Sequence, residues 1–267
     1  MNKQEILKEY KNQEDRILLS YVLDKINFVE TRNKIESTNF LSLYQTSLVE
    51  SFLKKIKYHN FCFWGGYESA ERKILILYPE KFNQDMVNKN YDHIMGIIRI
   101  KLPKTEYGKY THRNYLGGIV KLGLDREKVG DILVKDEEAD IIALKESIKF
   151  LLQELPTLKR FENSKITEKS LDELYIVEPK VEEIKIIVPS LRLDNFVSDL
   201  ARTSRNKAVD IIKSERVFLN GNLETKTSKT IKEKDTITIR GKGRFVVKQI
   251  NGTTRSGRTI VVIEKFV

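Results

Sequence analysis

The stretch RTSRNKAVDIIKSERVFLNGNLETK, residues 202–226, decides the fold of the C-terminal part of the chain. Ser204 is a residue type that favours the N-cap of a helix, and apolar residues follow it at helical spacing. RVFLNGN then predicts a strand that enters a tight turn, because Asn220 and Gly221 both accept the positive φ that such turns need. The stretch therefore predicts a short helix followed by a β-hairpin.

Two basic side chains stand in the first turn of that helix. Arg205 and Lys207 lie where the helix dipole is already positive, and each basic residue there costs up to about 1 kcal/mol. Unpaired backbone N–H groups at a helix start can hold a phosphate, and these side chains would add charge and donors. Arg202 ends the preceding helix close to Ser204 and is expected nearby. We interpret this corner as a site for an anionic ligand.

The flanking segments extend the same unit on both sides. LRLDNFVSDLA, residues 191–201, predicts a helix with one buried face, and DTITIRG, residues 235–241, alternates at the strand period. Residues 241–267 predict two further strands joined by a Gly-rich basic turn. EEIKIIVPS, residues 182–190, predicts a strand just before this basic module. Arg192 and Asp194 are expected to pair with each other or to cap the first helix.

The positive charge is concentrated in this module. The chain has 267 residues and a net charge of +10, and residues 190–267 hold 17 Lys and Arg against 8 Asp and Glu. The remaining residues hold 31 basic against 30 acidic side chains. This asymmetry indicates a basic module on a near-neutral body, and nucleic acid is the usual partner of such a module. The alternative is a surface whose charge only maintains solubility.

The rest of the chain predicts an α+β fold with two further domains. Residues 2–57 show helical spacing, with a second helix capped by Ser37 or Thr38, so a helical domain is expected over 1–58. Residues 59–180 predict strands at FCFWGG, KILILYP, IMGIIRIKLP and DIIAL, and a helix at LKESIKFLLQELPTLKR. The basic module occupies 181–267.

The basic module resembles the S4 RNA-binding domain. RLDNFVSDLARTSRNKAVDIIKSERVFLNGN and KEKDTITIRGKG match that family in order and spacing from Leu191 to about Gly243. In S4 domains the helix pair and the following strand face RNA. That role falls here on Arg202, Ser204, Arg205, Asn206, Lys207 and Lys213. A second cluster flanks the glycines of RGKGR and comprises Arg240, Lys242 and Arg244. Arg255 and Arg258 sit at a turn and are secondary candidates.

Two middle segments narrow the resemblance. WGGYESAERKILILYP, residues 64–79, and THRNYLGGIVKLGLDREKVGDILV, residues 111–134, look like the YlmH family of bacterial S4-domain proteins. This resemblance implies a ferredoxin-like, RNA-recognition-motif-like middle domain and a non-enzymatic factor. It also implies binding to rRNA of the large ribosomal subunit and to peptidyl-tRNA in ribosome-associated quality control, with a further link to cell division. Asn114 departs from the family, whose members often carry Asp there.

Enzyme signatures are weak or missing. Pseudouridine synthases also carry S4 domains and use an Asp in an RLD signature, but the only RLD here, residues 192–194, lies inside the S4 helix. The nucleotide-binding signatures of tyrosyl-tRNA synthetases are absent. Two alternatives stay open, an RNA-modifying enzyme with an unrecognised site in residues 60–180 and a cell-division adaptor.

The sequence predicts neither a metal nor a cofactor. The three histidines and Cys62 do not have zinc-site spacing, and LGGIVKLG is neither a phosphate loop nor a dinucleotide fingerprint. HRNYLGG offers His112 and Arg113 as a second contact, but a strand-to-turn structural role is favoured. Trp64 and Tyr67 are candidates for base stacking, although core packing is favoured. A charged N-terminus, one cysteine and no long apolar run predict a cytoplasmic protein, expected to be a monomer without a membrane or small-molecule partner.

Overall fold

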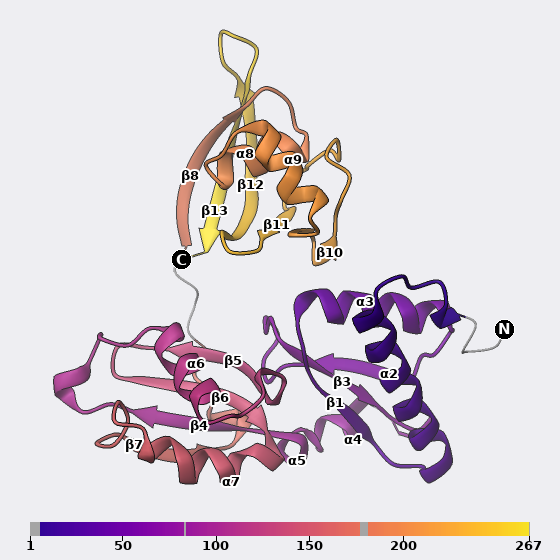
Figure 1. Ribbon diagram of the computed structural model, residues 1–267, viewed down its shortest axis with the longest axis vertical. Coiled ribbons are helices and arrows are strands. Elements are labelled where there is room, and N and C mark those ends of the chain that lie inside the picture. Colours follow the sequence, from indigo (N-terminus) through magenta and orange to yellow (C-terminus); the bar gives the residue numbers. More distant parts are fainter. Residues whose placement is uncertain (1–5, 83, 177–180, 267) are drawn as a thin grey trace. The chain divides into compact units, whose positions relative to one another are not determined.

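The computed structural model describes residues 6–82, 84–176 and 181–266. The chain forms two compact units, residues 1–177 and residues 178–267 (Figure 1). Two expectations fall outside the described residues, namely a helix over residues 2–5 and a domain boundary at residue 180.

The first unit begins with two helices on a three-stranded antiparallel sheet. The helices are α2 (Gln13–Arg32) and α3 (Leu43–Lys55), and the sheet has the order β1 (Glu36–Leu41), β3 (Lys73–Leu77) and β2 (Phe61–Trp64). Helix α2 begins at the N-cap Asn12, and α3 begins with a capping box between Ser42 and Gln45. Leu19, Phe52 and Leu75 are fully buried between the helices and the sheet.

The expectation of a purely helical domain over residues 1–58 is wrong. Ser37 and Thr38, expected to cap a helix, lie in β1 instead. Buried Thr38 accepts a hydrogen bond at Oγ1 from the backbone N–H of Leu75 at 3.0 Å, so it joins two strands. Pairing between strands more than thirty residues apart leaves no mark in helical periodicity, which explains the error. The expected boundary at residue 58 falls between α3 and a strand of the same sheet.

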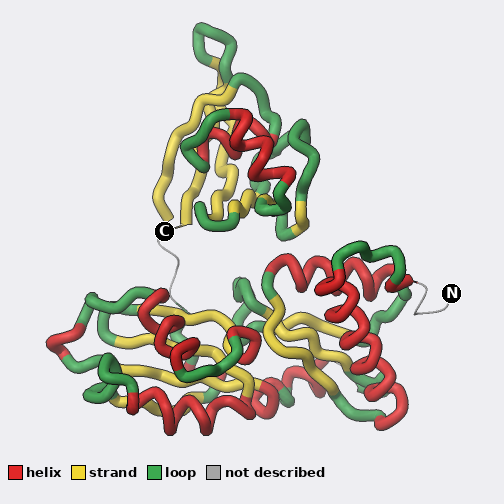
Figure 2. The backbone as a smooth tube through the Cα atoms, in the orientation of Figure 1, coloured by secondary structure: helices red, strands yellow, loops and turns green. Residues whose placement is uncertain are grey.

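The middle of the chain confirms the ferredoxin-like expectation. Its main elements, in chain order, are β4 (Met95–Lys101), α6 (His112–Lys121), β5 (Val129–Val134), β6 (Glu138–Leu144), α7 (Lys145–Glu154) and β7 (Lys165–Lys169). The sheet order is β5-β6-β4-β7 with every pair antiparallel, which is the β-α-β-β-α-β arrangement of ferredoxin-like domains. Helices α6 and α7 pack on one face of this sheet through residues such as Tyr115 and Leu151 (Figure 2).

Short helices lie in the segments between and after the main elements of the first unit. They are α4 (Gln84–Asn88), α5 (Tyr91–Ile94) and the 3-10 helices η1 (Lys104–Glu106), η2 (Arg126–Lys128), η3 (Leu155–Thr157) and η4 (Leu171–Glu173).

The HRNYLGG segment is the start of α6, so the strand-to-turn interpretation is wrong. Thr111 and Asn114 form the capping box that begins the helix. Gly118 lies inside the helix. Glycine suits this position because a Cβ there would come within 3.0 Å of the Phe161 ring and 3.3 Å of Leu158. Gly118 therefore serves close packing in a helix and not a turn, whereas a Cβ at Gly117 would meet nothing within 4 Å.

The second face of the middle sheet packs against the N-terminal sheet of the same unit. Phe40, Ile74, Met95 and Ile142 are fully buried in this shared core. Gly130 permits the contact, because a Cβ there would lie 2.7 Å from the Phe40 ring. The two sheets of the first unit are therefore joined by one continuous apolar interface.

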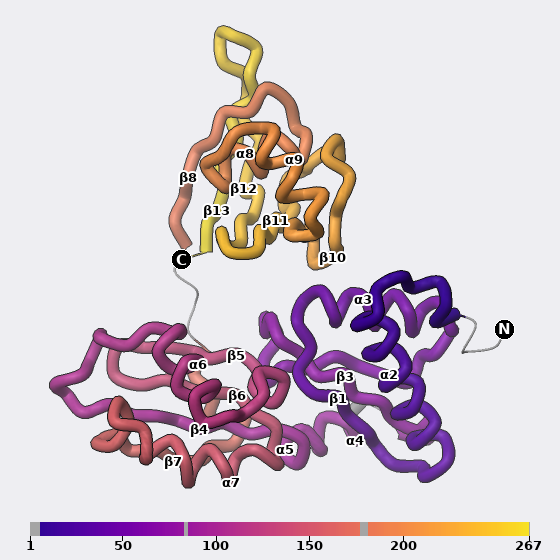
Figure 3. Tube along the Cα trace, in the orientation of Figure 1, coloured from indigo at the N-terminus to yellow at the C-terminus, as the bar shows by residue number. Residues whose placement is uncertain are grey.

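The second unit has the predicted pair of helices and small sheet. Its elements are β8 (Val181–Val188), α8 (Leu193–Leu200), α9 (Arg205–Lys213), β9 (Val217–Leu219), β10 (Asn222–Leu223), β11 (Thr236–Ile239), β12 (Gly243–Thr253) and β13 (Thr259–Phe266). The sheet order is β10-β9-β11-β12-β13-β8, so the first strand of the unit pairs with its last, as the trace in Figure 3 shows. The turn after β9 has positive φ at Asn220 and Gly221, as expected.

The core of the second unit lies between its helices and its sheet. Phe196, Ile212 and Val261 are fully buried there. In the part of the chain that the structure describes, no helix has the length and apolar character needed to cross a membrane.

Candidate nucleic-acid interface

The corner between α8 and α9 is built by local hydrogen bonds. Ser198 donates from Oγ to the carbonyl of Thr203 at 2.7 Å, and the N–H of Thr203 donates to the carbonyl of Ser198 at 2.9 Å. Ser204 caps α9 by accepting from the N–H of Lys207 at 3.4 Å. The corner therefore brings the end of α8 directly to the positive end of the α9 dipole.

Arg202 occupies a backbone position that glycine would fill more easily. It directly follows the C-cap Ala201 and has a φ of 51°, the left-handed conformation that usually selects glycine after a helix. A side chain in this conformation costs about 1 kcal/mol. The Arg202 side chain is exposed, so this position places a cation at the surface of the corner.

A hollow of about 460 Å³ opens beside this corner, which we call the corner hollow. The side chains that decide its character are Arg202, Thr203, Lys207, Asp210, Arg216 and Lys242. Four of these carry positive charge and one carries negative charge. The four basic residues are exposed, so the hollow presents a surplus of cationic donors to solvent. This arrangement suits a phosphate backbone.

Arg216 was not singled out from the sequence. Its carbonyl accepts from the N–H of Arg240 at 2.9 Å, and its Nη2 donates to the Arg240 carbonyl at 3.0 Å. These bonds join the start of β9 to the end of β11 and so bring Arg216 beside Lys242. The only signal in the sequence was its charge, because the strand pairing that places it spans more than twenty residues.

The second predicted cluster is divided by the structure. Lys242 lines the corner hollow, whereas the guanidinium of Arg240 lies 5.2 Å from the Phe218 ring centre and that of Arg244 lies 5.1 Å from the Phe266 ring centre. Gly241 and Gly243 both have positive φ, so they shape the turn between β11 and β12.

Arg205 has a partner inside the unit that the sequence did not predict. Its Nη2 donates to Oδ2 of Asp194 at 2.9 Å, and Arg192 donates to the same carboxylate at 2.9 and 3.1 Å. Asp194 is only 2% exposed. The charge of Arg205 in the first turn is therefore balanced inside the unit, and no ligand is needed to explain it. The expected pairing of Arg192 with Asp194 is confirmed.

The pKa of Asp194 reflects this environment. Burial raises the pKa of the carboxyl group, but the hydrogen bonds from Arg192 and Arg205 outweigh burial and hold the pKa below its usual value. Asp194 therefore stays ionised and anchors both guanidinium groups.

The other predicted residues of the second unit lie around these two features. Asn206 is exposed in the first turn of α9, and Lys213 is exposed in its last turn, outside the corner hollow. Arg255 and Arg258 are exposed at the turn between β12 and β13. Arg258 is close enough to Asp199 to oppose the rise that burial causes in the pKa of that carboxyl group.

His112 and Arg113 belong to the first unit. They occupy the first turn of α6, where the surrounding protein and nearby Arg126 lower the pKa of His112. Asn114 supplies the capping oxygen, because its Oδ1 accepts from the N–H and Oγ1 of Thr111 at 2.9 and 2.8 Å. An amide thus provides the acceptor that begins α6.

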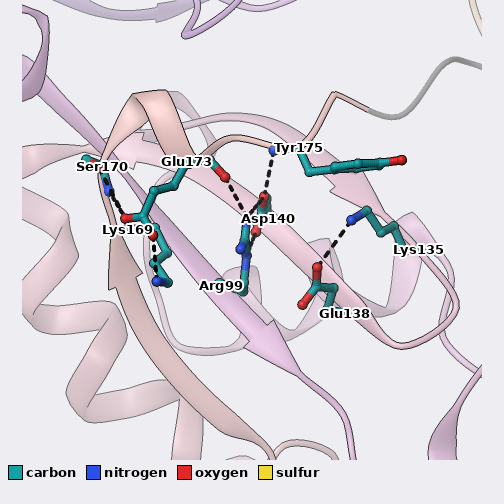
Figure 4. Close-up of polar contacts among 8 residues, drawn as sticks. All are labelled: Arg99, Lys135, Glu138, Asp140, Lys169, Ser170, Glu173 and Tyr175. Atoms are coloured by element: carbon teal, nitrogen blue, oxygen red, sulfur yellow. Dashed lines mark hydrogen bonds and ion pairs between the residues drawn. The ribbon is translucent and has the colours of Figure 1, made fainter.

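The second face of the middle sheet, beyond the part that packs against the N-terminal sheet, is covered by the chain itself. We call residues 170–176 the strap. Arg99 on β4 pairs through two hydrogen bonds of 2.7 Å with Asp140 on β6, and its Nη2 also donates to the carbonyl of Glu173 in the strap at 2.8 Å (Figure 4). Lys135 lies 3.2 Å from the ring centre of Tyr175. RNA-recognition motifs bind bases on this face, which here is occupied.

The aromatic candidates of the first unit are part of its packing, as favoured. Trp64 stacks on Tyr91 at 5.1 Å, and the Tyr67 hydroxyl donates to Asp131 at 2.9 Å. Within residues 6–82, 84–176 and 181–266, no group of three or more His, Cys, Asp or Glu side chains is arranged to hold a metal ion.

Comparisons with known proteins found a family model, a curated relative and a solved structure that are similar to this chain. Residues 88–173 match a family model described as "Putative RNA-binding domain in YlmH". The chain is 26% identical over 253 residues to the ribosome-associated protein quality control protein P2 of Bacillus subtilis (strain 168), covering 95% of this chain and 96% of the relative. A solved structure of the cell division protein ylmH from Streptococcus pneumoniae has 22% identity and a TM-score of 0.47, covering 61% of this chain and 96% of that one. The chain therefore contains a segment similar to the putative RNA-binding domain in YlmH, and over most of its length it is similar to the Bacillus subtilis relative.

Proposed function

We propose that the protein is a non-enzymatic RNA-binding factor of the ribosome. It binds rRNA of the large subunit, together with tRNA, during quality control of obstructed subunits that carry peptidyl-tRNA. The observation that carries this proposal is the corner hollow, where Arg202, Lys207, Arg216 and Lys242 face solvent with one acidic neighbour. The name of the Bacillus subtilis relative supports the ribosomal setting.

The hollow suits a phosphate backbone better than a compact small molecule. Its donors come from the α8–α9 corner, from α9, from Arg216 just before β9 and from the turn between β11 and β12, so they form a shallow charged surface without an enclosed pocket. Arginine and lysine side chains in such a surface replace the counterions of RNA, which makes binding dependent on salt. The single Asp of the RLD motif is held by two arginines and is 2% exposed, an arrangement that suits a structural role over catalysis.

The test is co-sedimentation with separated ribosomal subunits, with and without peptidyl-tRNA on the large one. The variant is Arg202→Gly/Lys207→Ala/Lys242→Ala, in which glycine preserves the left-handed conformation at residue 202. The matched control, Lys226→Ala/Lys229→Ala/Lys232→Ala, removes the same charge from exposed positions of the same unit outside the hollow.

We expect the wild type and the control to bind the large subunit, more strongly when peptidyl-tRNA is present, and the hollow variant to lose binding. No association of the wild type with either subunit would contradict the proposal. Equal losses in both triple variants would show that net charge alone drives binding.

A further inference from the structure

The middle domain carries its charge on two different surfaces. Residues 131–140, on the β5–β6 hairpin, contain 5 acidic and 1 basic side chain, and the strap adds 2 acidic ones. Residues 101–121, from the end of β4 to the end of α6, contain 5 basic and 1 acidic side chain. Residues 158–165 contain 3 basic and 1 acidic. The first unit is therefore near neutral overall but locally strongly charged.

The acidic surface is the one on which RNA-recognition motifs bind bases. It is covered by the strap through the bonds of Arg99 and Asp140, and Lys135 is held there by Glu138 at 3.2 Å and by the Tyr175 ring (Figure 4). A polyanion is repelled by carboxylates, and Arg99, Lys135 and Lys169 on this face already have internal partners. Base binding on the sheet would also require displacing the strap.

The basic surface surrounds a second hollow of about 480 Å³, which we call the loop hollow. It lies between the segment after β4 and the segment after α7, and Tyr110, Lys121, Lys159, Arg160 and Ser164 are among its lining residues. Two acidic residues, Glu106 and Glu162, also line it, and Glu106 is paired with Lys109 at 3.2 Å. Lys121 and Lys159 are exposed and make no ion pair with any described residue. They are available to an external anion.

The walls of the loop hollow are held in place by hydrogen bonds. Arg160 donates from Nη1 to the carbonyl of Asn114 at 2.5 Å, and its own carbonyl accepts from the Tyr110 hydroxyl at 3.1 Å. The Oγ of Ser164 is buried in this wall without a hydrogen-bond partner among the described residues. The hollow is thus a preformed surface with free donors, which lowers the ordering cost of binding.

We propose that the middle domain contacts the phosphate backbone of RNA through the loop hollow and not through its sheet. Lys121 and Lys159 bind phosphates there, and the Arg160 guanidinium, fixed by Asn114, supplies further charge. The family match over residues 88–173 contains every residue of this hollow and favours RNA over an acidic protein as the partner. This surface belongs to the first unit, so it is independent of the corner hollow.

The experiment measures binding of the full chain to purified large ribosomal subunits and to protein-free large-subunit rRNA over a range of salt concentrations. The variant is Lys121→Ala/Lys159→Ala, and Lys121→Arg/Lys159→Arg tests rescue by conserved charge. The matched control is Lys89→Ala/Lys149→Ala, which removes two exposed lysines of the same unit outside the hollow. Tyr175→Ala probes the sheet face.

We expect the alanine variant to lose about 3- to 30-fold in affinity near 0.1 M salt and its salt slope to fall by about 1 to 2. The arginine variant, the control and Tyr175→Ala should stay within about twofold of the wild type, since none removes a phosphate contact. Urea unfolding followed by the single tryptophan, Trp64, checks that the first unit stays folded.

Two results would overturn the inference. One is an alanine variant that binds RNA as tightly as the lysine control, and the other is a larger loss for Tyr175→Ala than for the alanine variant. The corner-hollow variant, measured in parallel, separates this inference from the proposed function. If the corner-hollow variant binds RNA normally while Lys121→Ala/Lys159→Ala does not, the inference about the loop hollow is supported and the proposed role of the corner hollow is contradicted.

Discussion

Each unit of the molecule contains a buried aspartate that pairs with arginine, but the number of arginines per aspartate differs. In the first unit Asp140, which is 4% exposed, pairs with Arg99 alone, and the strap closes over the pair. In the second unit Asp194, which is 2% exposed, holds both Arg192 and Arg205 at the surface.

The difference separates a closed surface from an open one. On the middle sheet Arg99, Lys135 and Lys169 each have an internal partner, so this part of the sheet offers little to a polyanion. Around the α8–α9 corner one carboxylate serves two arginines, and Arg202, Lys207, Arg216 and Lys242 add charge beyond it. The surplus of cations over internal partners, more than their total number, identifies the candidate interface.

The largest expected loss of stability follows from changing the Arg99–Asp140 pair. Asp140→Asn leaves the largely buried Arg99 guanidinium without its carboxylate, and we expect the free energy of unfolding of the first unit to fall by about 2 to 4 kcal/mol. Urea unfolding monitored by Trp64 fluorescence measures this unit. Asp136→Asn, the same change at an exposed position, should have little effect. Equal losses of unfolding free energy in the two variants would contradict the comparison, because the Arg99–Asp140 pair would then stabilise the unit no more than an exposed carboxylate does.

We expect a smaller loss of stability when Asp194 of the second unit is changed. Asp194→Asn removes the shared acceptor of two exposed arginines, which water can still solvate, and should destabilise the second unit by about 1.5 to 3 kcal/mol. Amide hydrogen exchange in residues 193–213 reports on this unit. Asp199→Asn on the same helix should be neutral or slightly stabilising, because burial raises the pKa of Asp199 and so disfavours its charged form.

The same pair predicts a pH dependence. The folded-state pKa of Asp194 is lowered, so the carboxylate stabilises the fold above its unfolded pKa of about 4, and this contribution is lost as the pH falls through the folded value. Between pH 5 and pH 3, protection of residues 193–213 should fall less in Asp194→Asn than in the wild type. A parallel decline in both proteins would mean that other carboxyl groups control acid stability.

The smallest expected effect concerns the cap of α6. Asn114→Asp keeps the oxygen that accepts from Thr111 and adds negative charge at a helix N-terminus, so the first unit should gain about 0.3 to 1 kcal/mol. Asn114→Ala removes the acceptor and should destabilise the unit. Trp64 fluorescence during urea unfolding compares both variants, and a less stable Asp variant would contradict a purely capping role.

Local sequence patterns predicted the secondary structure of the second unit well. The Ser204 cap, the helical spacing of α8 and α9 and the Asn220–Gly221 turn are all set by neighbouring residues, and the structure has each of them. The ferredoxin-like middle was expected from resemblance, and the sheet order bears it out. Strand β1 was missed because only pairing with distant β3 defines it.

The candidate site was predicted only in part, for a similar reason. Arg202, Lys207 and Lys242 do line one hollow, but Arg216 joins them through pairing of β9 with β11. Arg205 was predicted to contact a ligand because its charge opposes the helix dipole, and the structure pairs it with Asp194, eleven residues earlier. Sequence shows that a charge is present, and only the fold shows whether it is already paired.

The most direct test compares two cations of the same helical turn. Arg205→Ala loses the ion pair with Asp194, whereas Lys207→Ala removes a side chain that faces the corner hollow and opposes the helix dipole. Affinity for protein-free large-subunit rRNA and hydrogen-exchange protection of residues 193–213 are measured for each variant.

We predict that Lys207→Ala weakens RNA binding by about 5- to 10-fold, as expected for one lost phosphate contact, with unchanged or slightly higher protection. Arg205→Ala should lower protection more than it lowers affinity. The opposite pattern, with normal RNA binding by Lys207→Ala and lost binding by a fully protected Arg205→Ala, would contradict the central claim that the cations left unpaired by the fold carry the interaction.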